Sequence, residues 1–486
     1  MFGRFWRRLS TIAGLSSLQM AATQLEERGA KRAPDRYALA SFPNDFLWGA
    51  ATSAYQIEGA VDEDGRGRSI WDTFVHTPGK IADHSNADRA SDHYHRYKED
   101  VRLLKALGVK AYRFSIAWPR VFPEGAGAPN PKGLDFYDRL VDELLSNGIE
   151  PFATLYHWDL PQLLQDRVGG WQSSETSKAF ANYAGYVAKR LTDRVKHIFT
   201  VNECSRFVSL GYGAGIDAPG LKLSQAGVNQ VRHHVALAHG LAVQAIRAHG
   251  LAGTKVGPAE DIAACLPAID TPANVRAAEI ATRELNAGFL GVILEGKYTE
   301  GFLENAGKDA PKYTADELKI ISSPVDFVGL NIYAPQYYVV AADRAPGFTV
   351  LPFPASFPHM DSEWLRVGPE TIYWVPRLAA KIWNIDTIYI SENGTSSADE
   401  MTGDGNVHDT DRIMYLRNYL TQLQRATAEG VPVCGYFLWS LMDNFEWTDG
   451  YKKRFGLYHV DLDTQRRTPK LSASFYREMI ERNAVA

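Results

Sequence analysis

The sequence has few cysteines, no long apolar run and no excess of positive charge. Its 486 residues include three cysteines, Cys204, Cys265 and Cys434, too few and too irregularly spaced for a disulfide framework or a zinc site. No apolar run approaches the ~18 residues that a membrane-spanning helix needs, so we expect no membrane insertion. A net charge of −5 gives no reason to expect nucleic acid or an anionic membrane as a partner.

Cofactor motifs are missing as well. The sequence contains no glycine-rich phosphate-binding loop. His233, His234 and His239 are close in sequence but lack the i, i+4 spacing of a helical zinc motif. We therefore expect no metal and no cofactor, and nothing in the sequence indicates an oligomeric state.

The first 41 residues differ from the rest and are interpreted as an extension that precedes a single domain, residues 42–486. Three arginines precede a mildly apolar stretch, residues 11–22, and a charged segment follows it, residues 26–36. Ser, Gly and Gln interrupt the apolar stretch, so we expect a cytoplasmic protein whose extension is disordered or loosely packed. The alternative is export to the periplasm through a weak leader of the twin-arginine kind.

From residue 42 onward, short apolar strands alternate with amphipathic helices and no linker divides them. Strands are expected at residues 46–55, 110–115, 150–156, 197–201, 254–257, 326–331, 388–392 and 433–439. Helices are expected at residues 92–107, 134–146, 176–191, 228–248, 274–290, 315–320, 369–383, 411–429 and 472–482. This alternation predicts an α/β fold, a (β/α)8 TIM barrel, with enlarged rim loops at 60–86, 341–367 and 442–470.

Two of the expected strands end in a glutamate with an asparagine neighbour. Residues 388–390 lead to Glu392, where the following Asn-Gly pair predicts a turn, and residues 197–201 lead to Glu203. Taken alone, Glu392 is equally well explained as a strand cap that binds turn amides. The C-terminal ends of barrel strands share one rim, so these distant residues can face each other. Retaining glycoside cleavage needs two such carboxyl groups about 5–5.5 Å apart.

Other polar and aromatic side chains are expected at the same rim. They are Gln56, Glu58, Arg113, His157, Trp158, Asn202, Asn331, Tyr333, Trp439, Glu446 and Trp447. Fixed polar groups can satisfy sugar hydroxyls, and indole faces stack on the apolar face of a pyranose. Any one of these residues is more simply a loop or core residue, but their convergence predicts a sugar site.

Several motifs resemble glycoside hydrolase family one, the retaining β-glucosidase family, over about residues 42–482. The matching segments are FLWGAATSAYQIEGA at 46–60, YRFSIAW at 112–118, YHWDLP at 156–161, NIY at 331–333, SENG at 391–394 and NFEW at 444–447. The resemblance implies an exo-acting enzyme that hydrolyses terminal unphosphorylated β-D-glucosyl residues through a covalent glycosyl-enzyme. Its partner would be a small-molecule β-glycoside.

The resemblance also implies residue roles. Glu392 would be the nucleophile and Glu203 the acid/base. The implied substrate-binding residues are Gln56, His157, Trp158, Asn202, Asn331, Tyr333, Trp439, Glu446 and Trp447, with Arg113 and Phe455 in supporting positions. An arginine and a phenol beside Glu392 would stabilise its anion, and that negative charge would raise the proton affinity of Glu203.

The sequence also allows other functions, and it departs from the family's pattern at some positions. Within the family, a β-galactosidase, β-fucosidase or transglycosylase is possible; outside it, a non-catalytic glycan-binding relative or an unrelated barrel enzyme such as an aldolase. Cys204 stands where the family usually has proline, which restores a backbone N–H after Glu203. The family's tryptophan on the aglycone side has no clear match in residues 369–374, where Trp374 is the candidate.

Overall fold

Eight parallel strands close into a barrel at the centre of the computed structural model, which describes residues 41–485. The strands are β1 Leu47–Ala51, β2 Ala111–Ser115, β3 Glu150–Tyr156, β4 His197–Asn202, β5 Lys255–Asp261, β7 Val328–Asn331, β10 Ile388–Asn393 and β11 Val433–Trp439. Their order around the barrel is β1-β11-β10-β7-β5-β4-β3-β2, and each neighbouring pair is parallel. The predicted (β/α)8 barrel is therefore confirmed.

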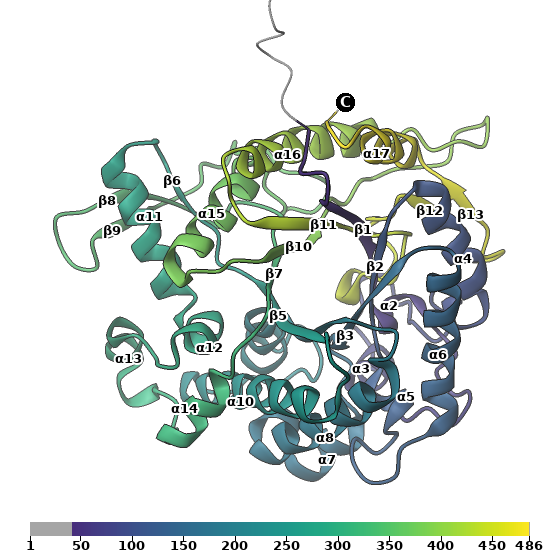
Figure 1. Ribbon diagram of the computed structural model, residues 1–486, viewed down its shortest axis with the longest axis horizontal. Coiled ribbons are helices and arrows are strands. Elements are labelled where there is room, and N and C mark those ends of the chain that lie inside the picture. The colour runs from purple at the N-terminus through teal and green to yellow at the C-terminus, as the bar shows by residue number, and fades with distance from the viewer. Residues whose placement is uncertain (1–40, 486) are drawn as a thin grey trace, which may run out of the picture. The chain divides into compact units, whose positions relative to one another are not determined.

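Helices surround the strands, as Figure 1 shows with α4 and α6 on one side, α8 and α10 below, and α16 and α17 above. The longer helices are α4 His93–Leu107, α6 Pro131–Ser146, α8 Ser174–Leu191, α10 Gln225–His249, α11 Pro272–Leu285, α15 Thr371–Trp383, α16 Thr410–Ala428 and α17 Leu471–Arg482. Short helices lie in the connections: α2 Ala54–Ile57, α3 Ile70–Val75, α5 Trp118–Val121, α7 Gln162–Val168, α9 Cys204–Phe207, α12 Val292–Glu295, α13 Glu300–Ala306 and α14 Ala315–Ile321. Apart from Ser41, the predicted N-terminal extension lies outside the described residues.

Aromatic side chains fill the barrel interior. The imidazole of His197 stacks on Phe152 with ring centroids 4.2 Å apart, and Phe437 lies 5.0 Å from the same phenyl ring. Glycine makes room for these rings, because a Cβ at Gly49 would lie 2.5 Å from Cδ1 of Phe437. The barrel is thus a packed core, and a site must form at the strand ends and rim loops.

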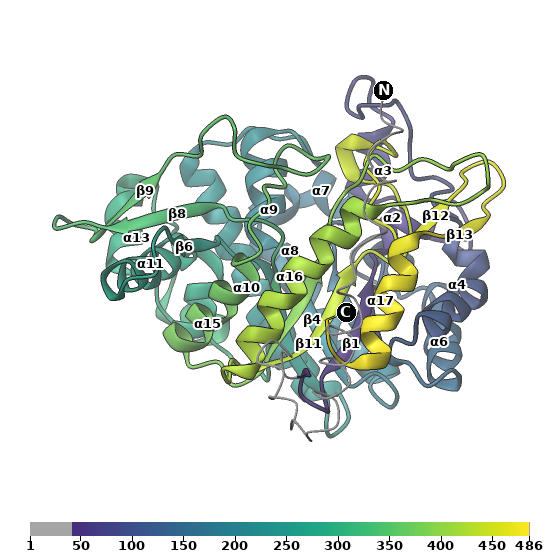
Figure 2. The same cartoon turned by 90° about the horizontal axis from the view of Figure 1, so that it is seen from above.

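Two small sheets lie outside the barrel, and of their strands β9, β12 and β13 fall within the predicted rim loops. β6 Cys265–Pro267, β8 Tyr337–Ala341 and β9 Phe348–Leu351 form a three-stranded sheet, and β12 Tyr458–Val460 pairs with β13 Arg467–Pro469. Figure 2 shows β8 and β9 extending sideways from the barrel. The fifth barrel strand is longer than expected: it continues past Gly257 and Pro258 to Asp261.

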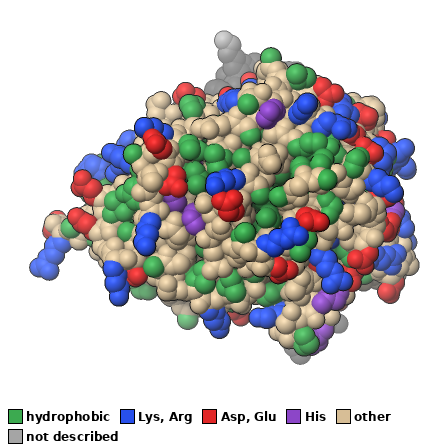
Figure 3. All heavy atoms as spheres, turned by 90° about the horizontal axis from the view of Figure 1, so that it is seen from below, with side chains coloured by type: hydrophobic (Ala, Val, Ile, Leu, Met, Phe, Trp, Pro, Cys, Tyr) green, Lys and Arg blue, Asp and Glu red, His purple; other side chains and the backbone are tan. Residues whose placement is uncertain are grey.

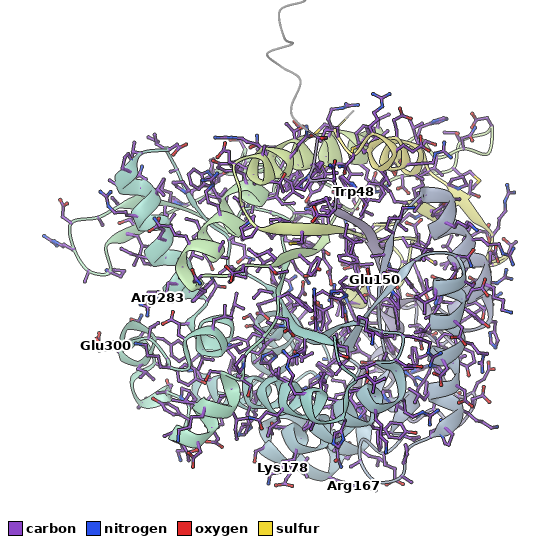
Figure 4. The ribbon with its side chains drawn as sticks, viewed as in Figure 1. Trp48, Glu150, Arg167, Lys178, Arg283 and Glu300 are labelled. Atoms are coloured by element: carbon purple, nitrogen blue, oxygen red, sulfur yellow. The ribbon has the colours of Figure 1, made fainter. Side chains whose placement is uncertain are left out.

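The outer surface carries charges of both signs. On the face shown in Figure 3, acidic and basic side chains are intermixed. Figure 4 shows Arg167, Lys178 and Glu300 at the periphery, pointing away from the barrel. Within residues 41–485, no helix is both long enough and apolar enough to cross a membrane.

Candidate active site

A cavity of about 760 Å³ lies at the C-terminal ends of the barrel strands. Ten of the predicted site residues line it: His157, Trp158, Glu203, Asn331, Tyr333, Glu392, Trp439, Glu446, Trp447 and Phe455. Three others, Gln56, Arg113 and Asn202, are fully buried behind the wall and hydrogen-bond to residues that line the cavity. Both glutamates at the centre of the sequence prediction thus face the same cavity.

Glu392 lies on β10 and is held by two hydrogen-bond donors. Nη1 of Arg113 donates to its Oε1 at 2.6 Å, and the hydroxyl of Tyr333 donates to its Oε2 at 2.8 Å. The Glu392 side chain is only 4% exposed, so both contacts are charge-assisted bonds in a dry environment and stabilise the carboxylate. Burial and the charge of Glu392 raise the pKa of Tyr333, so its hydroxyl keeps the proton that it donates.

Glu203 follows β4 and lies at the start of α9. Its backbone has φ 51° and ψ 58°, the left-handed conformation, which costs a non-glycine residue about 1 kcal/mol or more. Nδ2 of Asn331 donates to its Oε1 at 2.7 Å. Burial first, then the charges of Glu392 and Asp261, raise the pKa of Glu203 well above its usual value. Burial thus raises the pKa of Glu203 more than the charge of Glu392 does, although the sequence had suggested that charge as the cause.

Arg113 and Asn331 join the two glutamates through Asn202. Nη2 of Arg113 donates to Oδ1 of Asn202 at 2.6 Å, and Nδ2 of Asn331 donates to the same oxygen at 3.1 Å. The network continues to β10, where the hydroxyl of Ser391 donates to Oδ1 of Asn331 at 2.7 Å. Because the members are buried and bonded to one another, the carboxyl groups have little freedom to move apart.

Glu446 and Gln56 form a second polar part of the site. Nε2 of Gln56 lies 3.3 Å from Oε2 of Glu446, and also donates to the carbonyl of Phe445 and to Oδ1 of Asn444. Burial, followed by the charges of Asp449 and Glu392, raises the pKa of Glu446 to about 8. The carboxyl group of Glu446 is therefore poorly solvated and ready to accept hydrogen bonds from a ligand.

Aromatic rings line another part of the cavity. The indole of Trp447 stacks on Trp158 at 4.4 Å, and His157 stacks on Trp439 at 5.7 Å. Burial and the charge of Arg113 lower the pKa of His157, so its imidazole is neutral. Flat apolar faces beside fixed polar groups suit a sugar ring, which has an apolar face and a polar edge.

Several residues around the cavity were not predicted. Trp364 lines it and is 39% exposed, whereas the predicted Trp374 packs against the hydrophobic core. The guanidinium of Arg206 lies over the Trp364 ring, 5.7 Å from its centroid, and Asp261 at the end of β5 also lines the cavity. Burial raises the pKa of Asp261 to about 6. Trp364 lies in the expected rim loop 341–367, and no local sequence pattern marks it as a cavity residue.

Comparison with known proteins decides the family. The family model described as glycosyl hydrolase family 1 matches residues 38–485. The chain belongs to this family. Beta-glucosidase A of Acetivibrio thermocellus is 44% identical over 450 residues, covering 91% of this chain and 99% of that protein. Beta-glucosidase A of Thermotoga maritima is 42% identical over 445 residues, covering 91% and 98%.

Solved structures agree with this assignment. The β-glucosidase of Thermotoga maritima in complex with glucoimidazole superposes with a TM-score of 0.84 at 40% identity, covering 92% of this chain and all of that one. The protein is thus a family 1 glycoside hydrolase with the family's barrel.

In this family 1 enzyme, Cys204, which stands where the family usually has proline, uses the backbone N–H that proline lacks. The backbone N–H of Cys204 donates to Oε2 of Glu260 at 2.8 Å, and the N–H of Ser205 donates to Oε1 at 2.9 Å. Burial raises the pKa of the Cys204 thiol, so it remains protonated and unreactive.

Proposed function

We propose that the enzyme is a retaining exo-β-glucosidase that removes terminal, unphosphorylated β-D-glucosyl residues from small glycosides. The names of its relatives support this function, since they are called β-glucosidase or 1,4-β-D-glucan glucohydrolase. The observation that carries it is the unlike environment of two carboxyl groups in one cavity: Glu392 is bound by Arg113 and Tyr333, whereas burial and the charge of Glu392 raise the pKa of Glu203.

In the first step, the Glu392 carboxylate attacks the anomeric carbon of the glucosyl residue. The bond between this carbon and the glycosidic oxygen breaks, and Glu203 gives its proton to the departing oxygen. A covalent glycosyl ester on Glu392 and a free alcohol result. The raised pKa of Glu203 suits this step, because the acid must still hold its proton near neutral pH.

In the second step, water replaces the ester. Esterification removes the charge of Glu392, one of the groups that raise the pKa of Glu203. The Glu203 carboxylate then takes a proton from water as the oxygen attacks the anomeric carbon, releasing glucose with its original configuration. Arg113 and Tyr333, which donate hydrogen bonds to Glu392, stabilise the negative charge that returns to its carboxylate.

The remaining side chains bind the sugar. Glu446 accepts hydrogen bonds from hydroxyl groups, and the buried Gln56 and Asn202 hold Glu446 and His157 in place. Trp439 and Trp447 cover the apolar face of the ring. A 6-phosphate would meet the carboxyl groups of Glu446 and Asp449, which also lines the cavity, so unphosphorylated sugars are favoured.

The cytoplasm is the proposed compartment. All three cysteines are free, and Cys204 and Cys265 are buried, which suits a reducing environment. Cell fractionation tests this directly: recovery of the protein in the periplasm with a shortened N-terminus would support a cleaved leader instead.

The central experiment is trapping with an activated 2-deoxy-2-fluoro-β-glucoside. The inactivated enzyme should gain the mass of one fluoroglucosyl group, and peptide mapping should locate it on Glu392. Proton NMR of the first product from a β-glucoside should show the β-anomer before mutarotation. A label on another residue, or the α-anomer first, would refute the proposed mechanism; glucose binding without turnover would favour a non-catalytic relative.

A further inference from the structure

Glu260 is a buried carboxyl group that the mechanism above does not use. It lies near the end of β5, is 1% exposed, and does not line the cavity. Its two oxygens each accept a backbone N–H, from Cys204 at 2.8 Å and from Ser205 at 2.9 Å. These N–H groups belong to the two residues that directly follow Glu203, so Glu260 binds the segment that carries the proposed acid/base.

The segment needs such support because Glu203 has a left-handed backbone. A residue with φ 51° keeps this conformation only where its surroundings hold it. The N–H of Glu203 donates to the carbonyl of Ala259 at 2.9 Å, and the next two N–H groups donate to Glu260. Adjacent residues of β5 therefore fix the backbone at Glu203 and immediately after it.

We propose that Glu260 is a positioning residue for acid/base catalysis, which holds the left-handed turn at Glu203 by binding the N–H groups of Cys204 and Ser205. The proposal rests on the acid/base role of Glu203 proposed above. It also assigns a function to the departure at Cys204: proline has no N–H, so only a non-proline residue at this position can donate to Glu260.

The chemistry of Glu260 fits a backbone acceptor rather than a substrate contact. Burial raises its pKa to about 8, whereas hydrogen bonds from the Ser205 side chain and from the N–H groups of Ser205 and Cys204 act in the opposite direction by favouring the carboxylate. A buried carboxylate is costly unless hydrogen bonds compensate it. Here the compensating donors are the N–H groups of the turn after Glu203. Loss of either these N–H groups or the Glu260 carboxyl group therefore leaves buried polar groups unsatisfied.

Leaving-group dependence separates positioning from general stability. A dinitrophenyl β-glucoside needs little protonation of its leaving oxygen, whereas a methoxyphenyl β-glucoside depends on the acid. In Glu260→Gln, one N–H would face an amide NH2 group. We expect kcat/KM for the methoxyphenyl substrate to fall at least 10-fold, and for the dinitrophenyl substrate less than 3-fold, as for a weakened acid. Loss of folded protein would lower both values equally.

Variants at Cys204 supply the second test. Cys204→Ala retains the N–H and should keep the wild-type leaving-group pattern. Cys204→Pro removes one donor and should reproduce the selective loss. Glu260→Leu should show the loss most strongly, and the double variant Cys204→Pro/Glu260→Leu should recover at least part of it, because only one N–H then lacks an acceptor. Additive losses in the double variant would overturn the proposal.

The outcomes distinguish this inference from the proposed function. If Glu203→Gln shows the selective loss on the methoxyphenyl substrate but Glu260→Gln loses both substrates equally or neither, the positioning role of Glu260 is wrong and the acid/base assignment stands. If wild type hydrolyses neither glucoside, the proposed function itself fails. Thermal unfolding of each variant confirms that the rates are measured on folded protein.

Discussion

Arg113 binds Glu392 with Nη1 and Asn202 with Nη2, and both distances are 2.6 Å. One guanidinium thus connects the proposed nucleophile on β10 to the residue that precedes the proposed acid/base on β4. Its planar, two-pronged geometry suits this task, because two separate nitrogen atoms reach the two acceptors, whereas a lysine offers one. The strands of the barrel place these groups side by side although they are far apart in the sequence.

Replacing Arg113 should disable the nucleophile. In Arg113→Gln, Glu392 loses its counter-ion, and we expect kcat/KM for an aryl β-glucoside to fall by about 100-fold or more. Arg120→Gln is a matched control, because Arg120 forms a buried ion pair with Glu58 at 2.7 Å. Both variants should lose stability in thermal unfolding. A similar loss of kcat/KM in the control would show that the effect of Arg113 is structural.

Removing the side chain of Glu203 should make activity dependent on added nucleophile. Glu203→Ala should lose about 100- to 10,000-fold in turnover of a methoxyphenyl β-glucoside, the usual contribution of a positioned acid or base. With an activated dinitrophenyl substrate, azide should restore turnover and yield a β-glucosyl azide. Asp261→Asn, which alters another buried carboxyl group in the same cavity, should gain nothing from azide. An α-azide, or no rescue, would contradict the assignment.

Sequence reasoning succeeded where local pattern and barrel topology agree. The strand before Glu392 and the strand before Glu203 are short, apolar and followed by polar residues, and parallel closure brings such ends to one rim. The expected turn at Gly394 was inaccurate: β10 continues through Asn393, and a Cβ at Gly394 would lie 1.8 Å from the carbonyl oxygen of Trp439. Glycine is needed at position 394 because the backbone of Trp439 approaches it closely, and local sequence rules do not reveal such a tertiary contact.

Residues from irregular segments were harder to predict. The expected fifth strand ended at Gly257, yet β5 passes through Pro258, a residue that is unusual inside a sheet, and brings Glu260 and Asp261 towards the site. Trp364 lies in a loop without a repeating pattern. Its place in the cavity depends on how the loop folds back over the barrel. Likewise, the largest cause of the raised pKa of Glu203 is burial, which requires the packed structure.

Glu446 should contribute mainly to sugar binding. In Glu446→Gln, the carboxyl group that accepts hydrogen bonds from sugar hydroxyls becomes an amide with one acceptor oxygen, and we expect kcat/KM to fall by about 10- to 100-fold, mostly through KM. Asp449→Asn is the control, because this neighbour lines the cavity but has no proposed hydroxyl contact, and its kcat/KM should change less than 3-fold. Unchanged kinetics in Glu446→Gln would place the sugar elsewhere in the cavity.

The buried carboxyl group of Asp159 should make the stability of the enzyme depend on pH. Burial raises the pKa of Asp159 from 3.8 to about 8, although the charge of Arg66 opposes this shift. Between these two values the folded protein holds a proton that the unfolded chain has lost, so the free energy of unfolding falls as pH rises. The slope from one such group is at most about 1.4 kcal/mol per pH unit.

Asp159→Asn keeps the shape of this side chain and cannot ionise. Denaturant unfolding of wild type and variant at several pH values from 5 to 8 should therefore show the variant gaining stability relative to wild type as pH rises. The gain should level off above about pH 8, where Asp159 is ionised in both folded and unfolded wild type. Asp463→Asn, a change at an exposed carboxyl group, controls for the loss of one acidic residue. If wild type and Asp159→Asn differ by a constant amount at every pH, Asp159 is not protonated in the folded enzyme, and a charged partner must compensate its burial.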